Sequence, residues 1–299
     1  MVAQPNCAAS KRRPVSLTLV AFVLAGFFQS GFAARGDDAD TEHLFGFTEG
    51  ADIGKRGERE LETETIGRFG KSAGSYAGLT QNNEAKIVPV DNLRLGAKAT
   101  IAYFDISGVP GLADRGRAAL QGILFEARYT LLERNRYPFA LTVIAEPRWS
   151  RVDDTGGEPI TGFGGLLTVA MDRELIAGRL FGAFNVLYDS EASHFHISII
   201  RHYQSRIGMS AGLSARVQPA FFVGGEIRYL RAYDGLALDA FSGQAVFAGP
   251  TMYLQLSKRL AMSAAWNRQI FGRSTAGGGT MDLTHFERQQ AKIRVNLNF

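Results

Sequence analysis

Residues 291–299, AKIRVNLNF, alternate apolar and polar side chains up to the end of the chain. Successive side chains of an extended strand point to opposite faces, so Lys292, Arg294 and two asparagines share one face. The other face is apolar and carries Ala291, Ile293, Val295, Leu297 and Phe299. Alternation of this kind indicates a strand with one polar and one apolar side.

The same alternation recurs along the chain from residue 58 onward. In residues 93–103, for example, apolar side chains alternate with Arg94, Gly96, Lys98 and Thr100. About twelve such segments are separated by turn-forming residues. We expect strands at 58–70, 74–87, 92–105, 119–133, 137–151, 161–171, 175–189, 194–217, 219–232, 243–256, 260–271 and 285–299. The segment 194–217 is unusually long, which indicates either an external extension or a missed break.

The composition of the two faces favours a transmembrane β-barrel over a soluble β-sandwich, which also alternates. The polar faces carry arginine, lysine and glutamate beside glycine and serine, which suits a wet or ion-paired lumen. The apolar faces end in aromatic residues, as lipid-interface girdles do. These are Tyr103, Tyr129, Trp149, Tyr188, Tyr229 and Trp266. We therefore expect an all-β fold, an antiparallel transmembrane barrel of about twelve strands, with the sandwich as the alternative.

The connections between the segments predict how the barrel is oriented. Short turns fall at 89–91, 134–138, 172–174, 218–219 and 257–259, and longer connections at 106–118, 152–160, 190–193, 233–242 and 272–284. Bacterial outer-membrane barrels alternate short periplasmic turns with longer external loops. An even number of strands then places both ends of the barrel on the periplasmic side. The first hairpin, around 67–74, is short and fits this pattern least well.

The first 33 residues predict export. Lys11, Arg12 and Arg13 precede an apolar run from Val15 to Phe28, and a small-residue pattern follows that ends at Ala33. This is the pattern of a secretory signal peptide, because the run is shorter than the ~20 residues of a membrane-spanning helix. The only cysteine, at position 7, would be removed with the leader, which excludes disulfide and thiol chemistry in the mature chain.

The formal net charge of +4 comes largely from this leader, which leaves 30 basic against 29 acidic residues. A nearly neutral chain gives no case for nucleic-acid binding, which needs a concentrated basic face. The sequence contains no dinucleotide fingerprint, zinc-protease motif or Ser/His/Asp pattern. We therefore expect no cofactor, no metal, no catalytic residue and no nucleic-acid partner.

The terminal phenylalanine, with apolar residues at every second position before it, resembles the assembly signal of outer-membrane β-barrel proteins. The leader, the strands and the connections extend this resemblance over the whole chain. The stretch HLFGFTEG (43–50) resembles part of an uncharacterised, porin-like barrel family. The resemblance implies residence in the cell outer membrane, with membrane lipids and the barrel-assembly machinery as partners. It also implies that the assembly signal consists of Ile293, Val295, Leu297 and Phe299.

Charged residues on the predicted lumen faces are the candidate functional residues. A Glu-x-Arg pattern occurs on three segments, and residues two apart share a strand face. Two interpretations stay open: rings of charge that set the preference of a pore, or ion pairs between strands that fill the interior. The lumen set is Arg94, Lys98, Glu126, Arg128, Glu146, Arg148, Glu226, Arg228, Lys292 and Arg294.

Four glutamates line one face of the predicted first strand. Barrel closure would set this strand antiparallel to the last one, so these carboxylates would meet Lys292 and Arg294. Cross-strand ion pairs favour one alignment of partners, which indicates a closure and register device. The four residues are Glu58, Glu60, Glu62 and Glu64.

A second polar group shares one face of segment 194–217, namely His194, His196, Ser198 and His202. The group is a weak match to a metal site. It is also a weak match to an outer-membrane phospholipase, since Ile199 and Ile200 replace the asparagine-glycine that follows the serine in that enzyme. We expect a polar rim.

Three regions are predicted: a signal peptide (1–33), an N-terminal periplasmic segment or plug (34–57), and the barrel (58–299). If residues 34–57 enter the lumen, Glu49 and Asp52 could meet the inward arginines. The leading hypothesis is a narrow passive channel for small polar solutes. A closed structural or partner-binding barrel is the alternative, and a lipid-modifying enzyme is a third hypothesis.

Overall fold

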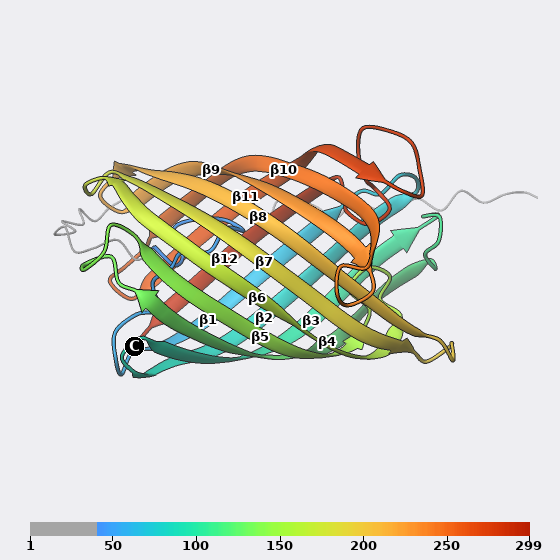
Figure 1. The fold of residues 1–299 in the computed structure, drawn as a ribbon, viewed down its shortest axis with the longest axis horizontal. Helices are drawn as coiled ribbons and strands as arrows, with labels where there is room; N and C mark the ends of the chain where they lie inside the picture. Colours follow the sequence, from blue (N-terminus) through green and yellow to red (C-terminus); the bar gives the residue numbers. More distant parts are fainter. Residues whose placement is uncertain (1–40) are drawn as a thin grey trace, which may run out of the picture. The chain divides into compact units, whose positions relative to one another are not determined.

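A computed structural model describes residues 41–299, which form a closed barrel of twelve strands (Figure 1). All neighbouring strands pair antiparallel, and β1 pairs with β12 to close the barrel. The predicted fold and strand number are confirmed. The strands are β1 (Arg59–Phe69), β2 (Ser75–Val90), β3 (Leu93–Ser107), β4 (Arg115–Leu132), β5 (Ala140–Val152), β6 (Pro159–Ile176), β7 (Leu180–Phe195), β8 (Arg201–Gln218), β9 (Phe221–Asp234), β10 (Ala240–Gln255), β11 (Leu260–Ser274) and β12 (Gln289–Asn298).

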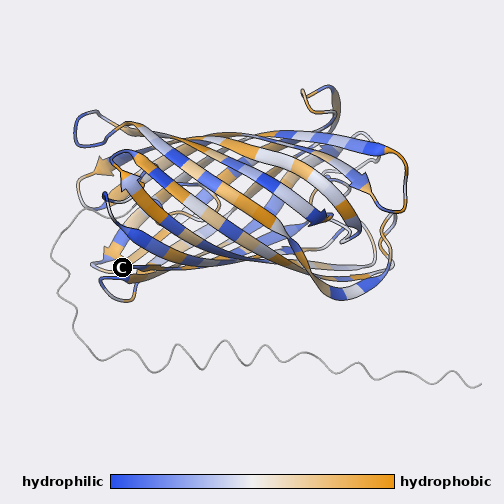
Figure 2. Cartoon of the chain, turned by 90° about the horizontal axis from the view of Figure 1, so that it is seen from below, coloured by the Kyte–Doolittle hydropathy of each residue, from blue (hydrophilic) through white to orange (hydrophobic). Residues whose placement is uncertain are grey.

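The strands place polar side chains inside the barrel and apolar side chains on its outer wall. Figure 2 shows the alternation of hydrophilic and hydrophobic residues along the strands. Lys86 and Arg94 are buried in the interior, whereas Phe125 and Phe163 are 58% and 63% exposed. A soluble protein buries such aromatic side chains and exposes such charges. This inverted arrangement suits a barrel whose outer wall meets lipid. No helix within residues 41–299 is long and apolar enough to cross a membrane.

The two ends of the barrel differ in their connections. At one end, here called the turn end, β2 and β3 are joined by Asp91 and Asn92, and Asn92 has the positive φ (64°) that such tight turns require. The backbone N–H of Phe299 donates to the carbonyl of Arg59 at this end. The other end, here called the loop end, carries the connections 70–74, 108–114, 153–158, 196–200, 235–239 and 275–288.

The long segment 194–217 contains a missed break, one of the two alternatives left open, because β7 continues to Phe195 and β8 begins at Arg201. Two predicted connections are wrong. The turn predicted at 172–174 lies inside β6, and the loop predicted at 190–193 lies inside β7. Asp172 and Ser190 are residue types common in turns, but here they and Glu191 are members of paired strands. The strict alternation of short and long connections is also only partial, since 133–139 at the turn end is as long as most loops.

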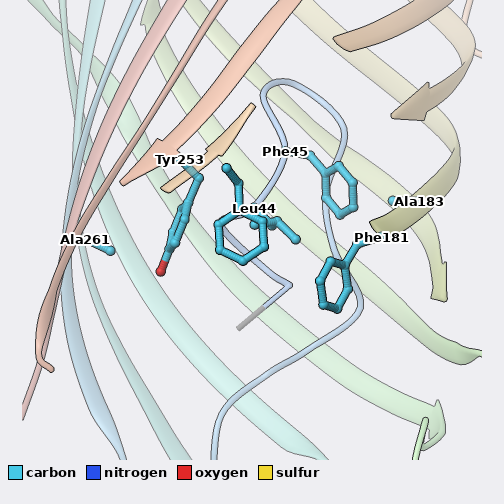
Figure 3. Packing of buried hydrophobic residues seen from close by; sticks show 7 residues of the cluster. Leu44, Phe45, Phe181, Ala183, Tyr253 and Ala261 are labelled. Atoms are coloured by element: carbon cyan, nitrogen blue, oxygen red, sulfur yellow. The ribbon is translucent and has the colours of Figure 1, made fainter. Parts of the chain in front are cut away.

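Residues 41–57, here called the N-terminal segment, precede β1, and the part up to residue 53 runs inside the barrel. Leu44 and Phe45 pack against Phe181, Phe222 and Tyr253 of the wall (Figure 3). Gly50 permits a tight fold of the segment on itself, since a Cβ there would lie 2.0 Å from the carbonyl oxygen of Thr41. The predicted signal peptide lies outside the described residues.

Candidate functional site: the barrel interior

Glu42 of the N-terminal segment lies at the centre of a buried charge network. Its carboxylate accepts hydrogen bonds from both terminal nitrogens of Arg94 on β3 and from Lys86 Nζ on β2 at 3.1 Å. Arg94 also contacts Glu126 on β4 at 3.2 Å. Removal of two or more charges from water is costly, and pairing with good hydrogen-bond geometry is what offsets that cost. The segment thus supplies a carboxylate that two basic wall residues need.

Glu49 forms a second anchor of the segment. Its carboxylate lies 2.9 Å from Arg294 on β12, 3.2 Å from Arg128 on β4 and 3.5 Å from Lys292. Arg128 and Arg294 belong to strands far apart in sequence and around the barrel. One carboxylate therefore ties together both sides of the interior.

The segment is also held through its backbone. Glu226 on β9 accepts hydrogen bonds from the N–H groups of Phe47 (2.9 and 3.0 Å) and Thr48 (2.8 Å), and from Asn267 Nδ2 on β11 (2.7 Å). Arg228 lies over the ring of Phe47 with its guanidinium carbon 3.9 Å from the ring centroid. Cation–π contacts of this kind strengthen when they are desolvated.

Near the turn end, both arms of the N-terminal segment meet Asp172 of β6. The carboxylate of Asp172 accepts hydrogen bonds from Thr41 Oγ1 (2.5 Å), from the Ala51 N–H (2.7 Å) and from Arg134 (2.6 Å). Arg134 also contacts Asp52 at 3.2 Å. The chain therefore enters the interior and returns to the same end.

The acidic face of β1 pairs with β12 as the seam hypothesis expects. Glu64 lies directly opposite Arg294 in the register and contacts it at 2.9 Å and Lys292 at 2.8 Å. Glu62 contacts Arg294 at 3.4 Å. Glu58 and Glu60 do not take part. Glu58 precedes β1 and accepts a hydrogen bond from the Lys55 N–H, and Glu60 contacts Lys86 of β2 at 3.0 Å instead of β12.

Four of the buried groups could also be considered as metal ligands. Donor atoms of Glu42, His43, Glu60 and Glu62 all lie within 4.8 Å of one another. Lys86 Nζ, however, lies 3.1, 3.0 and 2.7 Å from the three carboxylates. An ammonium group already supplies the positive charge that a metal ion would bring, so the geometry fits an ion-pair network better than a metal centre.

A polar cavity of about 440 Å³ lies toward the loop end. Arg148 of β5 contacts Asp189 (2.6 Å) and Glu191 (3.1 Å) of β7, and Arg206 of β8 contacts Asp189 at 2.8 Å. Arg68 of β1 lies 3.5 Å from Asp154 in the loop 153–158. Arginines and carboxylates therefore alternate around this cavity.

Two loops fold over the same cavity. Thr155 accepts a hydrogen bond from Tyr76 Oη at 3.0 Å, and Phe286 of loop 275–288 packs against Phe247. Asp153, in the first of these loops, accepts hydrogen bonds from the N–H groups of Thr155 and Gly156. Burial, together with the neighbouring charge of Asp154, raises the pKa of Asp153 to about 6.

A second cavity of about 670 Å³ opens toward the turn end. Its lining includes Asp52, Arg56, Glu133 and Arg134. The two cavities have no lining residue in common. Glu49 and its partners on the wall lie in neither lining, so this part of the N-terminal segment occupies the interior between the two cavities, whereas Glu42 and residues 51–53 line the turn-end cavity.

All ten predicted lumen residues have side chains inside the barrel, and most contact one another or the N-terminal segment. Lys98 bridges to Glu146 at 3.0 Å, and Arg128 contacts Glu126 on its own strand at 3.0 Å. Glu226 and Arg228 do not pair with each other but hold the segment. Whether any of them lines a path for solutes stays a prediction.

Sequence reasoning missed several members of this interior. Glu42, Lys86 and Asp189 received no role, and Glu191 was obscured because a loop was predicted at 190–193. The strand period could have revealed the last two, since both lie on the same face of β7 as Asn185. Glu49 was singled out as a partner for inward arginines, and its contacts with Arg128 and Arg294 agree with that expectation.

The histidine group does not form one strand face. His194 lies near the end of β7 opposite Arg201, whereas His202 lies on β8 opposite Ser193, so these two histidines point to different sides of the wall. His196 and Ser198 lie in the loop between them, where His196 is 3.2 Å from Thr161. The phase of a single long strand was the wrong basis for grouping them.

The four predicted assembly residues lie along β12 and at its end, on the outer wall. Ile293, Leu297 and Phe299 are exposed and Val295 is half-buried. Their role in assembly stays a prediction.

Comparisons with known proteins relate this chain to a protein family and to solved structures. The model of a family of unknown function (DUF6662) matches residues 37–299. A search of curated proteins finds no match. Among solved structures, the chain is similar to the COG4313 outer membrane channel from Pseudomonas putida F1, with 14% identity, a TM-score of 0.59, and coverage of 89% of this chain and 100% of that one. At this identity the likeness concerns the fold alone.

Two further solved structures show a weaker likeness. The KdgM porin is 7% identical with a TM-score of 0.44, over 80% of this chain and 99% of that chain. The translocator domain of autotransporter NalP from Neisseria meningitidis is 12% identical with a TM-score of 0.44, over 83% and 91% of the two chains.

Proposed function

We propose that this chain, which belongs to that family of unknown function, is an outer-membrane β-barrel that works as a narrow passive channel for small polar solutes and catalyses no reaction. The observation that carries the proposal is the pair of polar cavities at opposite ends of one charged interior. Diffusion through such an interior needs no chemistry, only size and charge complementarity. The loop end then faces the cell exterior and the turn end the periplasm.

The lumen set has two parts in this proposal. Arg148, with Asp189 and Arg206, forms the outer entrance. The remaining charges, gathered around Glu42 and Glu49, form the narrow section, where mixed charge favours neither anions nor cations strongly. The N-terminal segment obstructs the interior, because Glu49 and its ion pairs with Arg128 and Arg294 lie between the two cavities. Outer-membrane lipids and the assembly machinery are the partners that the location requires.

A closed barrel without transport is the second candidate, and the same segment favours it. Barrels of eight strands are filled by side chains, and those of sixteen or more hold open channels, so twelve strands lie between these cases. A segment held by two carboxylate anchors and by backbone hydrogen bonds could close such a barrel permanently.

Conductance of the purified full chain in planar bilayers separates the two candidates. The channel proposal expects small stepwise conductance increments that carry both cations and anions. Absence of steps from protein that retains its barrel would overturn the channel and leave the closed barrel. Two variants test whether the path lies inside the barrel. Ser150→Trp adds bulk in the outer entrance and should abolish the steps, whereas Ala145→Trp on the outer wall should leave them unchanged.

A further inference from the structure

A repeated pair of side chains marks the outer wall near the loop end. On four strands an aromatic residue is followed, two positions nearer the loop end, by an arginine on the same outward face. Because residues two apart share a strand face, each arginine projects from the wall just beyond its aromatic neighbour. The pairs are Trp149 with Arg151 on β5, Tyr203 with Arg201 on β8, Tyr229 with Arg231 on β9, and Trp266 with Arg268 and Phe271 with Arg273 on β11.

The strand register brings two of these arginines into one row. Arg231 lies opposite Gln244, and Gln244 lies opposite Arg273, so the two guanidinium groups are separated by two strand spacings, about 10 Å. Tyr229 and Phe271 form the corresponding row one step farther from the loop end, on either side of Val246. The wall there presents an apolar row with a basic row beyond it.

The five arginines are not compensated by the protein. None of the ion pairs formed among residues 41–299 involves them, although most arginines of the interior are paired. Four of the five are exposed. Arg231 is partly covered by Tyr233 and Phe241, whose ring centroids lie 5.3 and 4.8 Å from its guanidinium carbon, and its Nε has no hydrogen-bond partner in the described chain.

The pattern covers one part of the wall only. On β3 the position two beyond Tyr103 is Asp105, an acid. At the turn end, Tyr129 of β4 is followed on its outward face by Leu131. The aromatic–arginine pairs are therefore confined to β5, β8, β9 and β11.

We propose that these arginines bind phosphate groups of lipid head groups in the membrane leaflet at the loop end. The proposal rests on the proposed membrane location of the barrel. Aromatic side chains prefer the boundary between hydrocarbon and head groups, and the long side chain of an arginine beside them extends its charged end toward the head groups. Guanidinium groups match phosphate oxygens in charge and in hydrogen-bond geometry. A soluble phosphate would not need the apolar row beneath.

Tryptophan fluorescence can test this directly, because the chain has only two tryptophans and both belong to the pairs. In a Trp149→Phe background, Trp266 reports on lipids beside Arg268 and Arg273. The full chain is placed in phosphatidylcholine vesicles that contain a minor fraction of brominated phosphatidic acid or, separately, brominated phosphatidylcholine. We expect brominated phosphatidic acid to quench Trp266 more strongly than brominated phosphatidylcholine does, which reports enrichment of phosphatidic acid beside the arginines. This enrichment should fall roughly fivefold for each arginine removed in Arg268→Gln/Arg273→Gln.

A matched control removes two outward arginines from the turn end, Arg59→Gln/Arg173→Gln, and should keep the enrichment. The Arg268→Lys/Arg273→Lys variant should keep part of it and shows that the barrel tolerates change at these positions. Equal quenching by both lipids, or equal loss in both glutamine variants, would overturn the proposal. Displacement by millimolar inorganic phosphate would assign the arginines to a soluble anion instead. Conductance measured on the same samples keeps this outcome separate from that of the channel proposal.

Discussion

The carboxylate of Glu226 accepts hydrogen bonds from the backbone N–H groups of Phe47 and Thr48, so a residue of the wall holds the inner turn of the N-terminal segment. Hydrogen bonds to a charged group contribute about 1.5–3 kcal/mol each in buried settings. Glu226→Ala removes two such bonds and leaves two buried N–H groups without their acceptor. We expect the free energy that holds the segment inside the barrel to fall by a few kcal/mol. Residues 41–57 should then become accessible to protease from the turn end.

The barrel itself should survive this change, because the strand pairing of β9 with β8 and β10 uses other groups. We expect the variant to keep the circular-dichroism signal of its β-strands while protease cleaves the segment rapidly. Asp105→Asn on the outer wall serves as the control and should leave cleavage slow. A segment that stays protected in Glu226→Ala would show that the ion pairs of Glu42 and Glu49 suffice.

Glu49→Gln tests the charge balance of the interior. Glu49 contacts Arg128, Lys292 and Arg294, and its neutralisation leaves one excess positive charge in the narrow section. A charge in a confined, low-dielectric lumen acts strongly on passing ions. The reversal potential in a salt gradient should therefore shift toward anion preference relative to the wild type. An unchanged reversal potential in Glu49→Gln, with conductance present, would place the path away from this residue.

The strand pattern was readable from sequence because one face of every strand must meet lipid and the other the lumen. Alternation is dictated residue by residue, as in 291–299 and in β3, where Leu95 and Ile101 point outward while Arg94 and Lys98 are inside. Errors arose at loop-end positions such as Ser190 and Glu191, where a strand continues beyond the apolar belt and its outward residues are polar.

The interior network was only partly predictable. The phase identified which charges point inward, but the partner of each charge depends on the path of the N-terminal segment, which has no period to follow. Ion pairs between neighbouring strands were one of the two interpretations left open, and Arg94 of β3 with Glu126 of β4 is such a pair. The contacts of Glu42 with Lys86 and Arg94 depend on the fold of a loop inside a barrel, and no local pattern signals them.

Gly50→Ala should loosen the N-terminal segment without affecting the wall. A Cβ at Gly50 would lie 2.0 Å from the carbonyl oxygen of Thr41, and backbone atoms cannot move aside as a flexible side chain would. Forced displacement of this kind costs on the order of 1–3 kcal/mol. Gly277→Ala is the matched control, because a Cβ there meets no atom within 4 Å. Faster cleavage of residues 41–57 in the first variant and not in the second is the expected result.

Phe299→Ala tests the assembly role that the C-terminal strand suggests. The backbone N–H of Phe299 bonds to Arg59 and does not depend on the side chain, which is 55% exposed on the wall. The folded barrel should therefore lose little stability when refolded in detergent. In cells, we expect a several-fold lower amount in the outer membrane. Equal amounts of variant and wild type in isolated membranes would remove the assembly role of this residue.

Asp153 should give the outer entrance a pH dependence. Burial and the charge of Asp154 raise its pKa from an ordinary value near 4 to about 6. The folded chain therefore binds more protons than the unfolded chain between these values, so the contribution of this group to stability falls as the pH rises through 6. Above pH 6 the loop 153–158 also gains a negative charge beside the cavity.

Cation preference should rise between pH 5 and 7 with a midpoint near 6, measured with the pH changed on the loop side only. Asp153→Asn should abolish the step and Asp114→Asn, in another loop, should keep it; a step that persists in Asp153→Asn would assign the titration to a different group.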